Sequence, residues 1–232
     1  MKNISQMMNG KALLMMLLGI GAAAGLSSCS MSKPGKGLAA YQAYDRPAKL
    51  PQNPQAVRVK VSLSKQRIYV MEGNEMLLAM PVSVGKSDSP TPTGNYRISD
   101  KVEKYRANTH GLARSGDTFR QTYLKNKPAG WDFRGSPMPY WCEFKTAYGF
   151  HTGWIKHTPC THGCIRLHEN LAPKFYRIVS KGTPVSISYS QAEDAQWANM
   201  PLPPDSGPLP DYPKEFYWNG DYFTKHKTPT FE

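Results

Sequence analysis

The stretch "VRVKVSLSKQRIYVMEGNEMLLAMPVSVG" (residues 57–85) decides the fold class of this chain. Its odd positions from 57 to 63 are Val, Val, Val and Leu, and they alternate with polar residues as in a strand with one buried face. A second apolar run at 68–71 is followed by a Glu-Gly-Asn turn, and a third run reaches Gly85. Three short runs joined by turns predict an antiparallel meander and therefore a β-rich domain.

Further strands are predicted downstream of this meander. Apolar runs at 138–144 and 147–153 predict two strands, and the alternation at 183–189 predicts a closing one. The one strong helical period begins at Leu171, with Asn170 as its expected N-cap. We therefore expect a mostly β domain of the α+β type with one main helix.

Two other parts of the chain show no clear period. Residues 101–137 are polar, basic and aromatic, which predicts long loops over a scaffold. Residues 190–232 form a Pro- and aromatic-rich C-terminal extension. So many aromatic residues argue against a solvated tail. We expect this extension to pack back on the domain, and the alternative is a surface that binds a partner or a glycan.

The N-terminus has the pattern of an export signal. Residues 1–28 carry a positively charged start, an apolar run shorter than the ~20 residues of a membrane-spanning helix, and small residues at the end. The "LSSC" sequence that ends at Cys29 resembles the bacterial lipobox, in which the cysteine is lipidated. An ordinary signal peptide with an incidental cysteine is the alternative. Residues 29–56 have scattered Pro, Gly and Lys and predict a tether, and Ser30 favours the outer membrane as destination.

The net charge of +12 is strongly positive. For an exported chain the available anions are cell-wall polymer, lipid head groups and acidic peptides, so we expect no nucleic-acid partner. The membrane contact is expected only through the N-terminal lipid, and we expect a monomer on the periplasmic face of the cell envelope.

The stretch "GFHTGWIKHTPCTHGCIRLHENL" (149–171) concentrates residues that carry chemistry. It contains four of the six histidines and two of the four cysteines: His151, His157, His162, His168, Cys160 and Cys164. Zinc binding is one interpretation, but structural zinc sites usually take a second ligand pair from a separate segment. His110 and His226, the remaining histidines, are isolated in sequence. The spacing therefore disfavours zinc.

A disulfide is the second interpretation, because an exported protein can oxidise its thiols. If Cys29 is lipidated, three cysteines remain and one stays unpaired. A bridge between Cys142 and Cys160 would leave Cys164 free, whereas a bridge between Cys160 and Cys164 would disable Cys164 as a nucleophile.

Nucleophilic catalysis is the third interpretation. A cysteine thiol is mostly protonated at neutral pH and needs an imidazole or backbone dipoles to act as a nucleophile. His151 lies on a predicted neighbouring strand and can be brought close to Cys164. Gly163 allows close backbone approach, so the amides of Gly163 and Cys164 could point at the oxyanion formed during acyl transfer.

Several motifs in family order resemble the L,D-transpeptidase catalytic domain family, also called YkuD domains. "THGCIRL" (161–167) is similar to its signature, and "VSLSKQRIYV" (61–70), "PVSVGK" with "TPTGNYRI" (81–98), "MPYW" (138–141) and "GFHTG" (149–153) are similar to other family segments. The resemblance extends over residues 57–189. It implies a YkuD-like, β-sandwich-type catalytic domain whose main helix follows the catalytic cysteine.

The resemblance also implies roles for individual residues. Cys164 would be the nucleophile and His151 the general base, with the backbone carbonyl of Thr152 holding the imidazole. His162 and Gly163 would shape the oxyanion hole and the acceptor side.

Three more residues are implied to bind substrate. Arg166 would brace the loop or meet a substrate carboxylate. Tyr140 and Trp141 would line the cleft, with simple packing as the alternative. Two features depart from the family pattern: the stretch between His151 and Thr161 holds only nine residues, and Cys160 has no family counterpart.

The implied activity is acyl transfer on peptidoglycan stem peptides. Cys164 would displace the terminal D-alanine of a tetrapeptide stem, and an amine would resolve the thioester. The product would be a 3-3 cross-link, an exchanged D-amino acid or an attached lipoprotein, depending on the amine. A carboxypeptidase or hydrolase on the same scaffold and a non-catalytic wall-binding lipoprotein are the alternatives. No metal or organic cofactor is expected.

Overall fold

Residues 37–232 are described by a computed structural model, and they are organised around one mixed sheet. The predicted signal peptide and Cys29 lie outside the described residues. The sheet has ten strands accompanied by short helices, so the mostly β fold class is confirmed.

Ten strands and three α-helices make up the regular structure of residues 37–232. The helices are α1 (Leu38–Ala43), α2 (Ala172–Ile178) and α3 (Lys214–Asn219), and none of them is long and apolar enough to cross a membrane. The strands are β1 (Val57–Ser62), β2 (Arg67–Glu72), β3 (Glu75–Ser83), β4 (Gly94–Arg97), β5 (Asp100–Ser115), β6 (Thr118–Tyr123), β7 (Asp132–Lys145), β8 (Tyr148–Thr152), β9 (Ile165–Leu167) and β10 (Pro184–Ser188).

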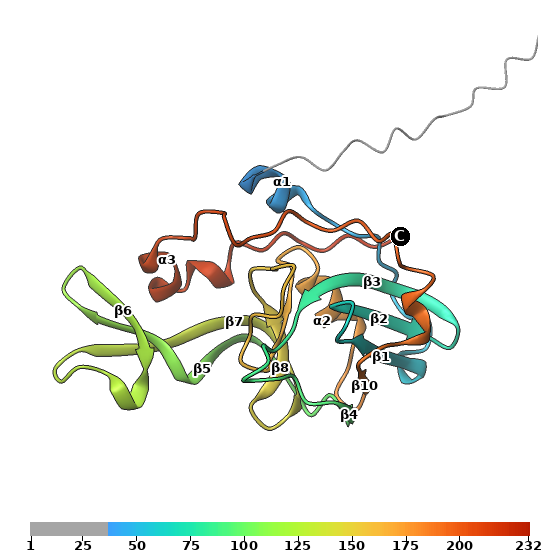
Figure 1. Cartoon of the computed structure of the whole chain (residues 1–232), viewed down its shortest axis with the longest axis horizontal. Coiled ribbons are helices and arrows are strands. Elements are labelled where there is room, and N and C mark those ends of the chain that lie inside the picture. Colours follow the sequence, from blue (N-terminus) through green and yellow to red (C-terminus); the bar gives the residue numbers. More distant parts are fainter. Residues whose placement is uncertain (1–36) are drawn as a thin grey trace, which may run out of the picture. The chain divides into compact units, whose positions relative to one another are not determined.

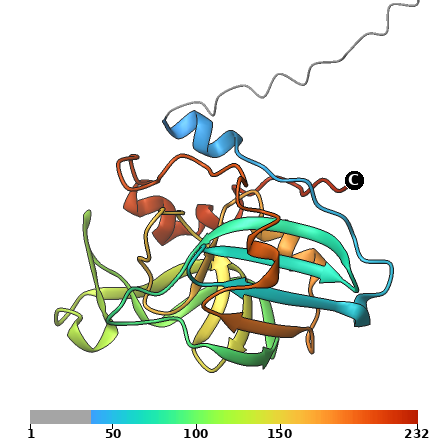
Figure 2. The ribbon, with the colours of Figure 1, turned by 45° about the vertical axis from the view of Figure 1, so that its right-hand side comes forward.

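The strand order is β4-β10-β1-β2-β3-β9-β8-β7-β5-β6 (Figures 1 and 2). The predicted meander corresponds to β1, β2 and β3. Two neighbouring pairs are parallel, β1 with β10 and β8 with β9, and the other pairs are antiparallel. The parallel pair β8–β9 therefore lies in the middle of the order, between β3 and β7.

One hydrophobic core is shared by both halves of this strand order. Val59 and Ile68 contribute from β1 and β2, and Phe150 and Ile165 contribute from β8 and β9, all at most 1% exposed. Helix α2 covers the core through Phe175, whose ring centroid lies 4.8 Å from that of Phe150. Each such side chain contributes roughly 1.5–3 kcal/mol by leaving water.

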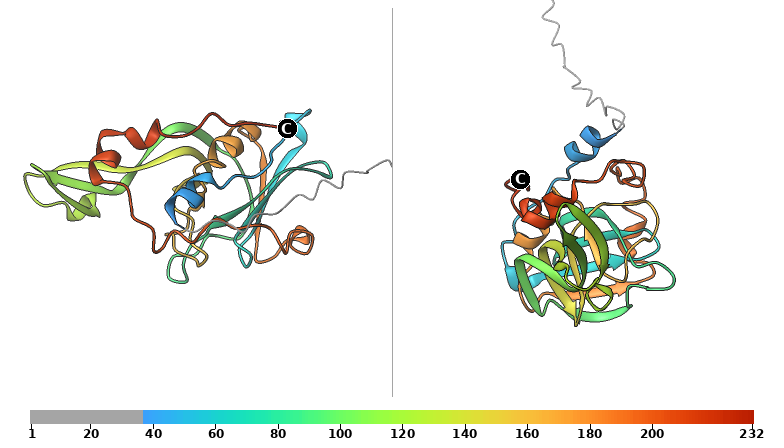
Figure 3. Two further views of the ribbon diagram at one scale, coloured as in Figure 1. Left: turned by 90° about the horizontal axis from the view of Figure 1, so that it is seen from above. Right: turned by 90° about the vertical axis from the view of Figure 1, so that its left-hand side faces the viewer.

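Strand β6 and parts of β5 and β7 form an arm that reaches away from the other strands (Figures 1 and 3). The expectation that residues 101–137 form long loops is wrong, since β5 alone runs for 16 residues. Most arm side chains are exposed or half-buried on both faces, as in β6. The arm strands therefore lack the alternating apolar residues by which a strand is predicted from sequence, and they were not predicted.

The arm bends where β5 passes β7. The register between these strands shifts between Arg106 and Gly111, and such a bulge bends the strand that carries it. A Cβ on Gly135 would lie 1.8 Å from the Ala107 carbonyl oxygen, and one on Gly111 would lie 2.1 Å from the Arg134 carbonyl oxygen. The close approach of strands β5 and β7 therefore requires glycine at both positions.

The N-terminal segment packs on the domain. Of the predicted tether at 29–56, the structure describes the part from residue 37. Tyr41 is 1% exposed, and its hydroxyl accepts a hydrogen bond of 2.9 Å from the Ile155 amide. Its ring centroid lies 4.5 Å from that of His168. One buried aromatic side chain thus fixes a segment whose composition resembles a linker.

The C-terminal extension also packs on the domain, as its aromatic content predicted. In Figure 1 it runs along one side of the domain to α3 and then returns. Met200 packs against Tyr69 of β2, and Trp218 of α3 is 6% exposed and has its ring 5.8 Å from Phe119 of the arm. The Glu232 amide donates a hydrogen bond to the Ala48 carbonyl at 2.9 Å, beside the N-terminal segment.

Helix α2 begins slightly later than expected. Its N-cap is Leu171, which makes no side-chain capping bond. The side-chain amide of Asn170, the expected cap, instead donates to the carbonyls of Gln42 and Tyr44 at 2.8 Å each. The polar residue at this position ties the N-terminal segment to the domain.

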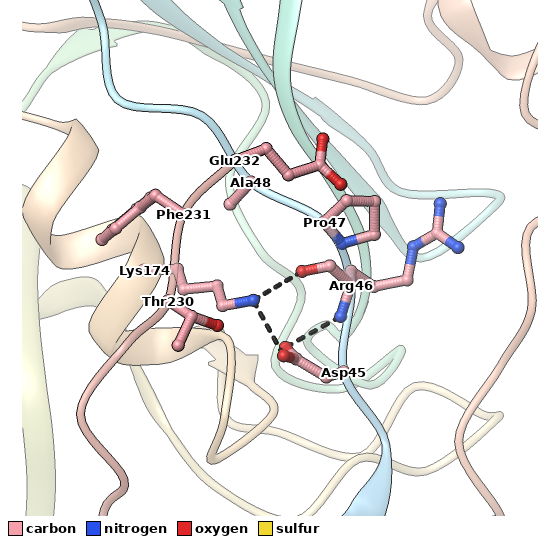
Figure 4. A pocket seen from close by; sticks show the side chains of 8 residues that line it. All are labelled: Asp45, Arg46, Pro47, Ala48, Lys174, Thr230, Phe231 and Glu232. Atoms are coloured by element: carbon pink, nitrogen blue, oxygen red, sulfur yellow. Dashed lines mark hydrogen bonds and ion pairs between the residues drawn. The ribbon is translucent and has the colours of Figure 1, made fainter.

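Lys174 of α2 is a second tie to the N-terminal segment. Its ammonium donates to the Asp45 carboxylate at 2.9 Å and to the Arg46 carbonyl at 2.7 Å, and the residue is only 3% exposed. Figure 4 shows these groups in the wall of a cavity of about 370 Å³ that Phe231 and Glu232 also line. Lys174 therefore lies where both chain ends meet the domain.

Replacing Lys174 should destabilise the fold. We expect Lys174→Ala to lower the free energy of unfolding by on the order of 2 kcal/mol, because the Arg46 carbonyl and the Asp45 carboxylate lose their donor. Urea denaturation measures this change. The matched control is Lys181→Ala, which removes an exposed pair with Asp100 (63% and 47% exposed) and should change the value by less than about 0.5 kcal/mol. Equal effects of the two substitutions would contradict the structural role of Lys174.

Candidate active site

The parallel pair β8–β9 determines where His151 and Cys164 lie. Phe150 pairs with Ile165, and both side chains are fully buried in the core. Because side chains alternate along a strand, His151 and Cys164 lie on the opposite face. Cys164 directly precedes β9, and continuing the register by one residue puts it beside Gly149 and diagonal to His151. Diagonal neighbours on one sheet face lie about 7–8 Å apart. Side chains of this length can span that separation.

The ring of His151 is held in one orientation. The residue is 9% exposed, and its Nδ1 lies 2.8 Å from the Thr152 carbonyl oxygen. A carbonyl can only accept, so Nδ1 carries the hydrogen and Nε2 keeps a lone pair. Burial and then the nearby Arg166 lower the pKa of His151 to about 4, against the opposing effect of the Thr152 bond. The imidazole is therefore neutral at pH 7.

The thiol of Cys164 is also neutral in the resting site. Burial raises its pKa, while the backbone at Gly149 and the charge of Arg166 act in the opposite direction. Its Sγ lies 3.8 Å from the Ala147 carbonyl oxygen, to which the thiol can donate. A neutral thiol and a neutral imidazole with a free Nε2 lone pair therefore lie on the same face of the sheet.

A tight turn presents Cys164. The Thr161 hydroxyl donates to the Cys164 carbonyl at 2.6 Å and accepts from the Gly163 amide at 3.1 Å. The Gly163 amide is therefore used inside the turn, which corrects the expectation that it points at a substrate oxyanion. Of the two expected amide donors, that of Cys164 remains. The side chain of His162, between Thr161 and Gly163, is exposed.

Gly163 is required by space as well as by conformation. Its φ is +106°, and a Cβ there would lie 2.4 Å from Cε1 of Tyr148. Its carbonyl accepts a 2.9 Å hydrogen bond from the Thr91 hydroxyl, which in turn accepts one from the Gly85 amide, also at 2.9 Å. Thr161, Thr91 and Tyr148 were missed by the sequence reasoning. Thr161 at least stands in the signature stretch itself.

Trp141 and Tyr140 of β7 point to opposite faces. The ring centroid of Trp141 lies 6.2 Å from that of His151, and a Cβ on Gly149 would lie 2.7 Å from its indole. Trp141 thus lies beside the candidate site. Tyr140 was expected to line the same cleft, but its ring packs 5.5 Å from Tyr176 of α2. The backbone of Tyr140 has a φ of +59°, which interrupts the regular extended strand beside Trp141, and packing is the role that the Tyr176 contact supports.

Arg166 lies next to Cys164 and His151 on the site face. Its stem passes over Gly153, where a Cβ would lie 2.8 Å from the Arg166 Cδ. Its Nη1 is 3.7 Å from the Cys160 sulfur. The guanidinium is therefore braced by the loop that follows β8.

The disulfide interpretation is not supported by the placement of the thiols. Cys142, Cys160 and Cys164, the cysteines in the described part of the chain, are all free. Cys142 is 0% exposed in the core, whereas Cys160 contacts Arg166 on the site face. Burial raises the pKa of Cys142 to about 12, so that thiol is unreactive.

His110 of β5 joins the site through the bend in the arm. Its ring centroid lies 6.4 Å from that of His162, and Ser136 Oγ lies 3.3 Å from its Nδ1. Burial, followed by the charges of His162 and Arg166, lowers the pKa of His110. His110 is isolated in sequence, and the bend in the arm brings it close to His162 in space.

The two remaining histidines of the 149–171 stretch have structural contacts. His168 is 0% exposed, with Nε2 2.9 Å from the Tyr41 carbonyl oxygen, and His157 Nε2 lies 2.9 Å from the Pro203 carbonyl oxygen. Across residues 37–232, no group of three or more His, Cys, Asp or Glu side chains is arranged to hold a metal ion.

Comparison of the chain with solved structures finds several similar ones. Similar ones are an L,D-transpeptidase (Yku) from Stackebrandtia nassauensis (21% identity, 62% of this chain, 60% of that chain, TM-score 0.44) and an L,D-transpeptidase from Mycobacterium smegmatis (20%, 57%, 58%, 0.44). A third is Mycobacterium tuberculosis L,D-transpeptidase 1 (20%, 57%, 61%, 0.41). The match spans about three fifths of the length of these chains. No curated protein sequence matches.

The family assignment rests on a sequence model. The model of the L,D-transpeptidase catalytic domain, YkuD, matches residues 56–187. This range is more than half of the chain and contains β1 to β9, α2 and nearly all of β10. The protein therefore belongs to the L,D-transpeptidase catalytic domain family.

Proposed function

We propose that this protein is a peptidoglycan L,D-transpeptidase in which Cys164 is the nucleophile and His151 the general base. The observation that carries the proposal is the shared face of β8 and β9, where Cys164 lies diagonal to an imidazole whose Nδ1 is held by the Thr152 carbonyl at 2.8 Å. That arrangement leaves Nε2 free for proton transfer, as a cysteine acyltransferase requires. The family assignment supports the same reaction class.

The first step forms a thioester. His151 Nε2 takes the proton of Cys164 as Sγ attacks the carbonyl that joins the third stem residue to D-alanine. The resting pair is neutral, so the proton moves as the bond forms. The imidazolium then gives the proton to the departing amine, D-alanine leaves, and the third residue stays on Cys164 as a thioester. The Cys164 amide is the proposed donor to the oxyanion, and the 161–164 turn fixes its direction.

The second step transfers the acyl group to an amine. The acceptor amine attacks the thioester carbonyl, His151 takes its proton and returns it to the sulfur, and Cys164 regains its thiol. A side-chain amine of another stem gives a 3-3 cross-link, a free D-amino acid gives exchange, and an amine of a wall-attached lipoprotein gives anchoring. His162 and His110 flank this acceptor side, and Arg166 meets a substrate carboxylate or braces the loop.

The location follows from the N-terminal pattern. Residues 1–28 are a signal peptide, and Cys29 carries a lipid that anchors the mature protein on the periplasmic face of the outer membrane. Removal of residues 1–28 takes away Lys2 and Lys11 and no acidic residue, so the net charge falls from +12 to +10. This positive charge favours encounter with stem peptides, which carry several carboxylates. We expect the protein to work as a monomer.

Mass spectrometry of the mature protein with a disaccharide-tetrapeptide tests the proposal. We expect a thioester adduct on Cys164, released D-alanine and an accumulating cross-linked or exchanged muropeptide. Cys164→Ala should remove the adduct and lower turnover by at least roughly a thousandfold, because the nucleophile is gone. The matched control is Cys160→Ala, which removes a neighbouring thiol and should retain the adduct.

Each other outcome of this experiment has a definite meaning. Release of D-alanine with only the tripeptide accumulating would assign a carboxypeptidase. An adduct that persists in Cys164→Ala would contradict the assignment of Cys164 as the nucleophile. A folded protein with neither adduct nor muropeptide change would point to a wall-binding lipoprotein.

The pH dependence of kcat/KM should have an unusually low acid limb. Activity requires neutral His151, whose pKa is lowered to about 4 from its ordinary 6.5, so the rate should stay flat down to about pH 5 and fall below it. An acid limb near 6.5 would contradict the neutral resting pair. Circular dichroism at each pH is the control, because the folded state also loses stability in this range. Unfolded chains bind protons at His151 and His168 from about pH 6.5, whereas in the folded state the pKa of each is about 4. The free energy of unfolding therefore falls as the pH is lowered from about 6.5 to 4.

Gly163 should be intolerant of a side chain. Gly163→Ala should lower the rate of thioester formation on the order of a hundredfold, because Tyr148 or the 161–164 turn must shift to make room for a Cβ. The matched control is Gly116→Ala, at φ +56° with no atom near the added Cβ, which carries the conformational strain alone. Single-turnover kinetics with the disaccharide-tetrapeptide measures both. Similar rates in the two variants would show that the turn does not position the thiol.

A further inference from the structure

A groove crosses the outer face of strands β4, β10 and β1, in the half of the strand order that does not carry β8 and β9. Its volume is about 460 Å³, and Arg58, Lys60, Asn95, Arg97 and Ser186 line it. Strands β2 and β3 separate β1 from β9 in the sheet order. The groove is therefore distinct from the Cys164 site.

The strand register arranges the polar groups in two rows. Pro184 pairs with Arg97, and the pairing of Val59 with Val185 puts Arg58 beside Pro184 on the other side. The two arginines thus flank Pro184 about 10 Å apart, at two strand spacings. In the second row, Ser186 pairs with Lys60 on one side and with Asn95 on the other.

Both guanidinium groups are anchored by backbone. Arg97 Nη1 donates to the Gly182 carbonyl at 2.8 Å, and Arg58 donates to the Gly73 carbonyl. Each guanidinium has five N–H donors, so most of them stay available for a ligand. Anchoring reduces the freedom that an arginine loses when it binds, which favours a planar, bidentate partner.

The charge of the groove selects the ligand. Lys60 is paired with Glu193 at 2.5 Å, so the net charge comes from Arg58 and Arg97. Among the described residues that line the groove, none is acidic. Two separated guanidinium groups fit a ligand with more than one carboxylate, and a phosphodiester chain is the competing chemistry.

We propose that this groove is a second, non-catalytic site that binds the carboxylates of a peptidoglycan stem peptide. This inference rests on the proposed function, because that function supplies the polymer near the protein. A stem held here keeps the enzyme on the polymer between turnovers. The next stem then reaches Cys164 at the effective concentration of a tethered substrate rather than at its bulk concentration.

Binding to insoluble peptidoglycan tests the groove separately from catalysis. Sacculi freed of attached polyanions are sedimented with the mature protein in a Cys164→Ala background, so that no covalent turnover occurs. We expect the Arg58→Gln/Arg97→Gln double variant to raise the Kd roughly three- to tenfold, and sacculi with amidated carboxylates to lose the difference between variant and parent. The control is Arg120→Gln/Lys125→Gln, which removes two exposed charges from the arm and should leave the Kd near that of the parent.

A second readout separates this proposal from the catalytic one. With Cys164 intact, both double variants should form the thioester with soluble disaccharide-tetrapeptide at the parent rate. An unchanged Kd in the groove variant, or an equal loss in the control variant, would overturn the proposed site. Undiminished binding to amidated sacculi, or a groove-dependent preference for anionic lipid vesicles, would overturn the carboxylate assignment. Absence of a thioester in the parent protein would instead sink the proposed function and leave the groove result standing.

Discussion

The pairing of β8 with β9 is the constraint on which the candidate site depends. Phe150 and Ile165 are drawn into the core from these strands, and strand alternation then leaves His151 and Cys164 together on the other face. A slip by one residue would put the imidazole in the core and an aromatic ring in the site. The hydrophobic effect acting on two core residues therefore sets the geometry of two polar ones.

Electrostatics of the site follow from the same burial. Desolvation lowers the pKa of His151 and raises that of Cys164, so the low dielectric favours the neutral forms of both groups. Arg166 shifts the balance toward the thiolate and against the imidazolium, because its charge lowers both pKa values. The Thr152 carbonyl does the opposite for His151 by stabilising the proton on Nδ1. The balance of these effects leaves both groups neutral at pH 7.

The parts of the fold that could be predicted from the sequence are the strands whose buried residues form apolar patterns. The meander at 57–85 and the strands around Phe150 appear as apolar patterns because β1 alternates buried and half-buried residues, while β2, β3 and β8 are buried along most of their length. The arm was missed because most of its side chains are exposed or half-buried on both faces, and the segment at Tyr41 was missed because one aromatic residue gives no period. Likewise Cys164 and His151 could be inferred from residue type and motif. The position of His110 beside the site could not be inferred, since it depends on the close approach of strands β5 and β7 at Gly111 and Gly135.

The C-terminal extension connects both walls of the candidate site. Trp154, three residues after His151, donates its indole N–H to Asp211 at 3.0 Å, and its ring lies 5.2 Å from that of Tyr212. A few residues later, the Trp218 carbonyl accepts a 2.8 Å bond from Arg134 at the bend of the arm. One segment thus holds the loop after β8 and the arm that carries His110. The contacts that join the loop after β8 to the arm through this segment are therefore made by residues beyond the family domain, which ends at residue 187.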